Sequence, residues 1–308
     1  GSGFPGCGVA RCIPVSGETL ERAERLAGLL GLPGPGAVVD ALVGDAWESL
    51  SRALQGVGRG GGVYLVGAGP GAWDLATVRG LLLVRAADAL VYDRLVDPAL
   101  VSRARPGAGL YYVGKAPGAH AASQGEINDL LAELASGGGL VVRLHGGDPL
   151  TYGRGEEECA HLAARGVRCG VVPGVPSFTA AAAVAMAPLA GRGFSSVFAV
   201  ATATRAGGSP TDPGRLEALA RAADSVAVLM GARRLAGVGR ALARVDPEMP
   251  VVVVERAYME GERVVDATAG ELAGGAVEAR GPAVVIAGGA ARWRREVWGR
   301  AAGVGCSC

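Results

Sequence analysis

Short, wholly apolar runs alternate with longer segments rich in Ala, Leu, Arg and Glu from Val63 onward. Because successive positions in the short runs are all apolar, both faces of each strand are expected to be buried, which is typical of a mostly parallel sheet covered by helices. The longer segments carry apolar residues at helical spacing. The pattern predicts strands at 63–67, 89–93, 110–114, 140–144 and 169–174, and helices at 74–86, 97–104, 123–136 and 155–165.

A second block of the same kind follows, and the boundary between the two is expected within 173–193. Its expected strands are 197–203, 225–230, 251–257 and 282–289, interleaved with helical segments at 213–223, 232–245 and 268–277. The fold class is therefore α/β, with two tandem α/β domains, an active-site cleft between them and an N-terminal helical extension. The predicted ranges are 1–61 for the extension and linker, 62–175 and 176–293 for the two domains, and 294–308 for a tail.

Composition narrows the class of ligand. The net charge is +1 and only 5% of the residues are aromatic, which argues against nucleic acid and against an anionic membrane surface. No apolar stretch reaches the ~20 residues of a membrane helix, so we expect a soluble, cytoplasmic protein. The cysteines are too scattered for a disulfide scaffold. A disulfide or metal cluster that joins the chain ends is conceivable, although free thiols are favoured: Cys7, Cys12, Cys306 and Cys308.

The glycine turn in "VYLVGAGPGAWDL" has the spacing of a dinucleotide fingerprint, and Asp93 follows at a suitable distance. However, Pro70 removes one backbone donor, and Asp74 is the expected N-cap of the next helix. A helix that starts so late cannot present its N-terminus to a phosphate. Backbone packed closely against a neutral or cationic ligand is favoured over an NAD(P) site, and a purely structural turn stays open.

Two further loops carry candidate chemistry. In "LVVRLHGGDPLTYGRGEEE" a strand runs into Gly146-Gly147-Asp148 and then Tyr152, which is typical of a loop that lines a ligand. Four cations are expected at strand ends: Arg94, Lys115, Arg154 and Arg192. Such a cluster favours a ligand with several carboxylates, while solvated surface cations are the alternative. His120 and His145 are expected to be polar rim residues, because no spacing in the sequence supports a metal site.

These stretches, in this order, resemble the tetrapyrrole methylase superfamily and, within it, the uroporphyrinogen-III C-methyltransferase family. The resemblance covers roughly residues 62–290, and its most specific parts are "YDRLV", "VGKAPG" and "GGDP…GRGEE". It implies a homodimer that uses S-adenosylmethionine, releases S-adenosylhomocysteine and needs no metal. It also implies methylation of uroporphyrinogen III at C2 and C7 to give precorrin-2, toward sirohaem or cobalamin.

Motif matching implies roles for individual residues. Asp93 falls at the family's proposed proton acceptor and Lys115 at its proposed proton donor. The cations Arg94, Arg154 and Arg192, together with Tyr152, are expected to bind the substrate. The positions where the family contacts the cofactor are Pro70, Gly146, Gly147, Asp148, Thr151, Pro176, Ser177, Met230 and Ala257.

The chain departs from the family's usual pattern at three places: Gly71-Ala72-Trp73, His145 and Ala190-Gly191. These departures leave open a different tetrapyrrole substrate, or a module that binds tetrapyrrole or cofactor without catalysis. The remaining alternative, from another enzyme class, is an NAD(P)-dependent oxidoreductase built on the glycine turn.

Overall fold

The computed structural model describes residues 62–114, 122–205 and 208–299. The predicted helical extension over 1–61, Lys115 and His120 lie outside the described residues. What is described divides into two compact units, with the division between Val175 and Pro176. Each unit holds one five-stranded sheet with helices on both faces, which confirms the tandem α/β architecture.

The first unit contains an entirely parallel sheet in the order β3-β2-β4-β1-β5, as the apolar runs predict. Its elements are β1 (Gly62–Gly67), η2 (Trp73–Leu75), α3 (Val78–Ala86), β2 (Ala89–Tyr92), α4 (Pro98–Val101), β3 (Gly109–Tyr112), α5 (Gln124–Ser136), β4 (Leu140–His145), α6 (Gly155–Ala164) and β5 (Cys169–Val172).

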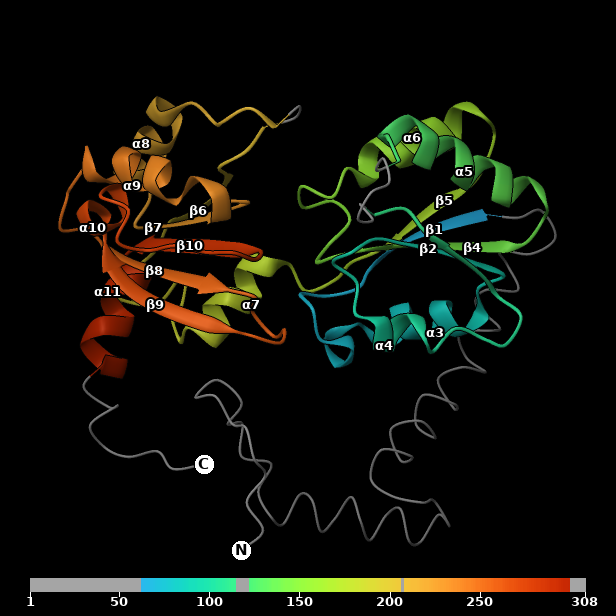
Figure 1. Ribbon diagram of the computed structural model, residues 1–308, viewed down its shortest axis with the longest axis horizontal. Helices are drawn as coiled ribbons and strands as arrows, with labels where there is room; N and C mark the ends of the chain where they lie inside the picture. Colours follow the sequence, from blue (N-terminus) through green and yellow to red (C-terminus); the bar gives the residue numbers. More distant parts are fainter. Residues whose placement is uncertain (1–61, 115–121, 206–207, 300–308) are drawn as a thin grey trace, which may run out of the picture. The chain divides into compact units, whose positions relative to one another are not determined.

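The two faces of this sheet are covered by different helices, α3 and α4 on one and α5 and α6 on the other (Figure 1). Strand alternation sorts the side chains between the faces. Val66 and Leu144 pack under α3 and α4, whereas Leu65 and Val141 pack under α5 and α6. Arg143 and His145 follow Val141 at alternate positions of β4, so their side chains also point toward α5 and α6.

The first helix begins later than predicted. Asp74 does not cap it, because residues 73–75 form a short 3₁₀ turn instead. Thr77 is the N-cap of α3, and its side chain accepts a hydrogen bond from the backbone N–H of Gly80. Trp73 is held by two contacts with the α4 region: its N–H donates to Asp97 over 3.0 Å, and the guanidinium of Arg103 lies 3.3 Å from its ring centroid.

The second unit contains a mixed sheet in the order β6-β7-β10-β8-β9. Only β6 and β7 pair in parallel, and the other neighbours are antiparallel. The sequence pattern missed β9, an edge strand whose positions are mostly exposed or half-buried. The elements are α7 (Ser177–Val184), β6 (Phe198–Thr202), α8 (Pro213–Ala222), β7 (Ser225–Leu229), η4 (Ala232–Arg234), α9 (Leu235–Ala243), β8 (Pro250–Glu255), β9 (Arg263–Thr268), α10 (Ala269–Ala273), β10 (Ala283–Gly288), α11 (Gly289–Trp293) and η5 (Arg294–Trp298).

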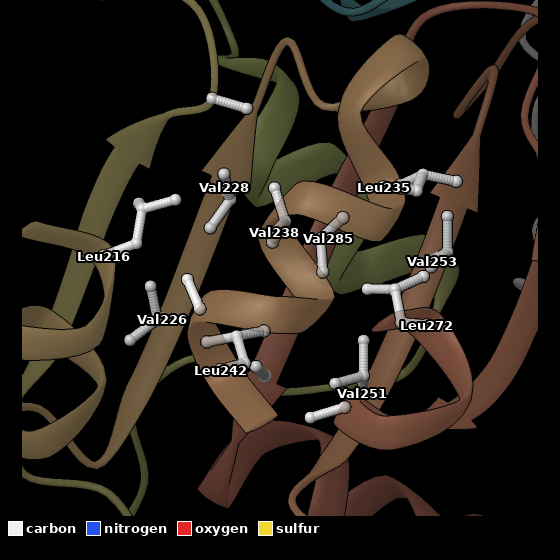
Figure 2. Packing of buried hydrophobic residues seen from close by; sticks show 14 of the residues in the cluster. Leu216, Val226, Val228, Leu235, Val238, Leu242, Val251, Val253, Leu272 and Val285 are labelled. Carbon is white, nitrogen blue, oxygen red and sulfur yellow. The ribbon is translucent and has the colours of Figure 1, made fainter. Parts of the chain in front are cut away.

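Small and branched aliphatic side chains build the core of the second unit. Leu235, Val238 and Leu242 of α9 pack onto the valines of β7, β8 and β10, with Leu216 and Leu272 at the sides (Figure 2). The opposite face of the sheet packs against α7 and α11. Because both faces are apolar, the ligand-binding groups of this unit have to lie at the ends of its strands.

A disulfide that the sequence did not indicate joins Cys159 of α6 to Cys169 of β5, with Cα atoms 5.5 Å apart. It links the helix to the strand that follows it. The four terminal cysteines lie outside the described residues. Within the described part of the chain, no helix has the length and apolarity needed to cross a membrane.

Candidate active site

The C-terminal edge of the first sheet contains a topological switch point. Strands β1 and β4 are neighbours, but the connection after β1 runs toward β2 on one side and the connection after β4 runs toward β5 on the other. The helices in these connections cover opposite faces of the sheet. In open α/β sheets a ligand binds in the crevice at such a point. The loops that follow β1 and β4 are the two glycine loops singled out from the sequence.

The structure joins these two loops directly. The N–H of Gly69 donates to the carbonyl of Gly147 over 3.3 Å, and the N–H of Gly147 donates back to Gly69 over 2.7 Å. The N–H of Ala68 donates to the carbonyl of His145. Pro70 is thereby brought beside the Gly146-Gly147-Asp148 loop. Beyond the parallel pairing of β1 and β4, an isolated antiparallel bridge thus links the two loops.

Glycine is required where the loops meet. A Cβ on Gly67 would lie 2.7 Å from the carbonyl oxygen of Gly147 and would overlap the backbone of Gly174. Gly69 and Gly147 have φ of 79° and 74°, a region that residues with a Cβ rarely adopt. A Cβ on Gly146 would lie 2.6 Å from the Cβ of Leu95, so the loop after β2 packs there too.

Asp148 fixes the shape of the loop after β4. One carboxylate oxygen accepts from the N–H of Leu150 and the hydroxyl of Thr151, and the other accepts from the N–H of Gly174 over 3.0 Å. The side chains of Asp148 and Thr151 are therefore engaged with the protein itself. Any ligand contact that this loop makes is expected to come mainly from its backbone.

Strained backbone occurs at several of the same strand ends. Tyr152 and Arg154 have φ of 58° and 64° in the loop after β4. In the second unit Met230, directly after β7, has φ of 56°, and Arg256 and Tyr258 flank Ala257 with φ of 54° and 58°. Non-glycine residues in this region cost free energy and concentrate at functional sites. The loops predicted to contact a cofactor are thus conformationally unusual.

No helix N-terminus follows the first glycine turn closely. Pro70 has no N–H, residues 73–75 form the short 3₁₀ turn, and α3 starts only at Val78. A dinucleotide cradle requires a helix that starts within the turn and points its N–H groups at the pyrophosphate. The geometry therefore disfavours NAD(P) and suits a ligand without phosphates.

Asp93 follows β2 at the same edge of the sheet and is held by two hydrogen bonds. Its Oδ1 accepts from the N–H of Leu95 over 2.9 Å, and its Oδ2 lies 3.3 Å from Nη2 of Arg143. The Asp93 side chain is 27% exposed, whereas that of Arg143 is 6% exposed. The carboxylate is therefore accessible from outside but anchored from within.

Arg143 belongs to a buried polar group under α5 and α6. Its Nε lies 3.5 Å from the carboxylate of Glu158, which is fully buried. Nε2 of His145 lies 2.8 Å from the other Glu158 oxygen, and Gln124 donates to Glu158 over 3.0 Å. The prediction that His145 is a rim residue is wrong, because it is 3% exposed and paired.

Glu158 carries its negative charge inside this group. Burial by itself raises the pKa of the Glu158 carboxyl. The hydrogen bond from His145, the charges of His145 and Arg143, and the Gln124 amide outweigh burial and hold the pKa below its ordinary value of 4.5. Sequence reasoning missed Arg143, Glu158 and Gln124. The sequence signal for this buried group was present in "LVVRLH", where Arg143 and His145 are two residues apart and therefore lie on the same face of an otherwise apolar strand.

The described cations among the four differ in their surroundings. Arg94 is exposed after β2, and Tyr152 is 43% exposed. Arg154 forms a bidentate pair with Glu157 at 2.9 and 2.7 Å, and this hydrogen bonding raises the pKa of Arg154. Lys115 lies outside the described residues.

Arg192 does not lie at the C-terminal end of a strand, and that expectation is wrong. It sits in a tight turn closed by Gly191 and Ser195, and the Ser195 hydroxyl bonds to that of Ser225, the first residue of β7. Met230 follows the last residue of the same strand. Five strand residues at about 3.3 Å each separate the two ends. Arg192 is thus at the opposite edge of its sheet from Met230.

Two of the remaining predicted residues of the second unit, Met230 and Ala257, share one end of its sheet. Strands β7 and β8 both run antiparallel to β10, so Met230 and Ala257 emerge at the same end of the sheet. Met230 is 49% exposed, and its carbonyl accepts from the Thr204 hydroxyl. Pro176 is the N-cap of α7 and Ser177 its first residue. Phe178 of α7 joins Ala257 in one hydrophobic cluster.

Among residues 62–114, 122–205 and 208–299, no group of three or more His, Cys, Asp or Glu side chains is arranged to hold a metal ion. The groups at the strand ends of the first unit are backbone groups, the exposed Leu150 side chain and the Asp93 carboxylate, and in the second unit the exposed Met230 side chain. Such groups suit a neutral or cationic ligand.

Comparisons with known proteins agree with this chemistry. The family model described as Tetrapyrrole (Corrin/Porphyrin) Methylases matches residues 62–273. A uroporphyrinogen-III C-methyltransferase from Methanobacterium ivanovii is 39% identical over 225 residues, which cover 73% of this chain and 95% of the relative. A siroheme synthase from Chromobacterium violaceum is 43% identical over 226 residues, 72% of this chain. The chain spans only about half, 47%, of that synthase.

Among solved structures, the uroporphyrin-III C-methyltransferase of Thermus thermophilus, complexed with S-adenosylhomocysteine, has a TM-score of 0.67 and 41% identity. The match covers 75% of this chain and 99% of that one.

Replacing Gly67 with alanine tests the close approach of the loops. Its Cβ would overlap Gly174, so backbone has to move, and we expect a lower melting temperature of the first unit in Gly67→Ala. Gly125→Ala in α5 is the matched control, since its Cβ meets only the Ser123 hydroxyl at 3.9 Å. Equal melting temperatures for the two variants in differential scanning calorimetry would contradict the packing.

A pH prediction follows from Glu158. Because its folded pKa is lowered, its charge stabilises the fold above pH 4.5, and this contribution is lost as the pH falls through the folded pKa. Glu158→Gln should lower the free energy of unfolding by about 3–5 kcal/mol at pH 7. The difference between the urea midpoints of wild type and variant should become smaller below about pH 4.5. Glu156→Gln, exposed on the same helical turn, is the control. A gap that is constant with pH contradicts the prediction.

Proposed function

Because this chain belongs to the tetrapyrrole (corrin/porphyrin) methylase family and is an S-adenosylmethionine-dependent methyltransferase, we propose that its substrate is uroporphyrinogen III. The proposed reaction methylates C2 and C7 and gives precorrin-2, a precursor of sirohaem and cobalamin. The siroheme synthases that match are about twice as long as the matched region, so this proposal concerns the methylation step alone.

One structural observation carries the cofactor assignment: two glycine loops meet at the switch point of the first sheet with no phosphate-binding helix behind them. S-adenosylmethionine supplies an electrophilic methyl group on a positively charged sulfur when it is bound. Half-buried backbone at Pro70, Gly71 and Gly146 and exposed apolar side chains suit this charge, whereas a helix N-terminus would repel it. We assign cofactor contacts to Pro70, Gly146, Gly147, Asp148, Thr151, Pro176, Ser177, Met230 and Ala257.

The chemistry left to the protein is alignment and proton transfer. After a ring carbon has been methylated, the tetrapyrrole loses a proton, and Asp93 is assigned as its acceptor. Its position supports this role, because the carboxylate is anchored by Leu95 and Arg143 yet open to solvent. Lys115 is assigned as the proton donor from the family resemblance alone.

Arg94, Arg154 and Tyr152 are assigned to the substrate's carboxylates and ring edges. Arg154 is paired with Glu157, but both side chains are about half exposed, at 52% and 47%. An exposed ion pair contributes little stability, so a substrate carboxylate is able to replace Glu157 at low cost. Arg192 is left out of this set because of its place at the far edge of its sheet. A homodimer and a cytoplasmic location complete the proposal.

The test is anaerobic incubation of the protein with uroporphyrinogen III and methyl-labelled S-adenosylmethionine. We expect label in the tetrapyrrole and a mass gain of two methyl groups. Asp93→Asn should reduce the transfer rate by about 10²–10⁴-fold, as expected for a lost proton acceptor. Its affinity for S-adenosylhomocysteine, measured by calorimetry, should stay near that of wild type.

Asp129→Asn, an exposed carboxylate on α5, is the matched control and should transfer at the wild-type rate. Intact binding of S-adenosylhomocysteine without label in uroporphyrinogen III would overturn the substrate assignment. Binding of NADH but not of S-adenosylhomocysteine would overturn the cofactor assignment. Full activity of Asp93→Asn would remove Asp93 from the mechanism.

A further inference from the structure

Arg143 is a buried cation between two carboxylates with different surroundings. One is Glu158, fully buried under α5 and α6, and the other is Asp93, 27% exposed at the end of β2. The register of the sheet accounts for this position. Arg143 lies on β4 opposite Val91 of β2, and Asp93 follows two residues later at the strand end. A long side chain on β4 therefore reaches along the sheet toward its C-terminal edge.

The guanidinium has no freedom in this position. Its Nη2 contacts Asp93, its Nε faces Glu158, and its Nη1 donates to the carbonyl of Leu144 over 2.6 Å. Three nitrogens of a planar group with three separate partners fix both its location and its orientation. Glu158 is held in turn by His145 and Gln124. The chain of contacts runs from the interior of the domain to the Asp93 carboxylate.

We infer that Arg143 is a positioning residue that holds the carboxylate of Asp93 as proton acceptor. The inference rests on the proposed function, in which Asp93 accepts the proton. With Oδ1 fixed by the N–H of Leu95 and Oδ2 by Arg143, the carboxylate presents one defined face to the outside. A small displacement of a catalytic group lowers the rate strongly without weakening ligand binding.

The competing role for Arg143 is only to neutralise the buried charge of Glu158. The two roles separate because each carboxylate can be removed alone. Glu158→Gln removes the buried charge and keeps the bond from Arg143 to Asp93. Arg143→Met with Glu158→Gln removes the Arg143 and Glu158 charges together, so that neither is left without the other, but leaves Asp93 without its partner.

The experiment measures single-turnover methyl transfer, calorimetric affinity for S-adenosylhomocysteine and the carboxyl ¹³C resonance of Asp93, assigned with Asp93→Asn. Positioning predicts that Arg143→Met/Glu158→Gln transfers at least about 10-fold more slowly, with affinity within about threefold of wild type. Glu158→Gln should keep its rate within about threefold. Arg143→Lys, which keeps a donor but not the planar fork, should fall in between.

The Asp93 resonance should move in the variants that lack Arg143 and stay in place in Glu158→Gln. Arg165→Met, which removes an exposed arginine paired with Asp129, is the control and should leave the rate and the resonance unchanged.

A double variant with the wild-type rate and an unmoved resonance overturns the inference. So does a Glu158→Gln variant that loses as much rate as the double variant. If wild type transfers no methyl group to uroporphyrinogen III, the proposed function fails, while the resonance still decides whether Arg143 holds Asp93.

Discussion

The close approach of three backbone segments at the end of the first sheet is the constraint on which the site depends. Gly67, Gly147 and Gly174 pack so tightly that a Cβ on Gly67 would overlap its neighbours. The reciprocal bonds between Gly69 and Gly147 are possible only because both residues adopt positive φ. This contact fills the switch point with paired backbone instead of a helix N-terminus, and Asp93 follows the neighbouring strand β2 at the same edge of the sheet.

The polar interior of the first unit supports that edge from below. Arg143 and His145 point into a mostly aliphatic layer, which is stable only because Glu158 and the Leu144 carbonyl satisfy them, and Gln124 in turn donates to Glu158. Replacing a buried ion pair by apolar groups of similar volume is often neutral or stabilising. The contact that Arg143 makes with Asp93, the proposed proton acceptor, is therefore better explained by catalysis than by stability.

The strands were largely predictable, because a short, fully apolar run bounded by turn residues is typical of a buried strand. The glycine loops were predictable because Gly-Gly and Pro weaken a strand and therefore mark its end. Strand β9 escaped notice because an edge strand that is half solvated lacks the apolar pattern. The sequence could not distinguish Thr77 from Asp74 as N-cap, since both residue types cap helices. The sequence also could not separate buried Glu158 from the adjacent exposed Glu156 and Glu157, because burial depends on tertiary packing. For the same reason it could not show that the turn with Arg192 lies at the start of β7.

The paired loops after β1 and β4 are proposed to form the cofactor edge of a methyltransferase, and everything said of Asp93 and Arg143 depends on that edge. A crystal structure of the protein with S-adenosylhomocysteine measures it most directly. We expect the ligand to contact the backbone of residues 67–71 and 146–151. A bound S-adenosylhomocysteine that leaves both loops untouched would contradict this assignment.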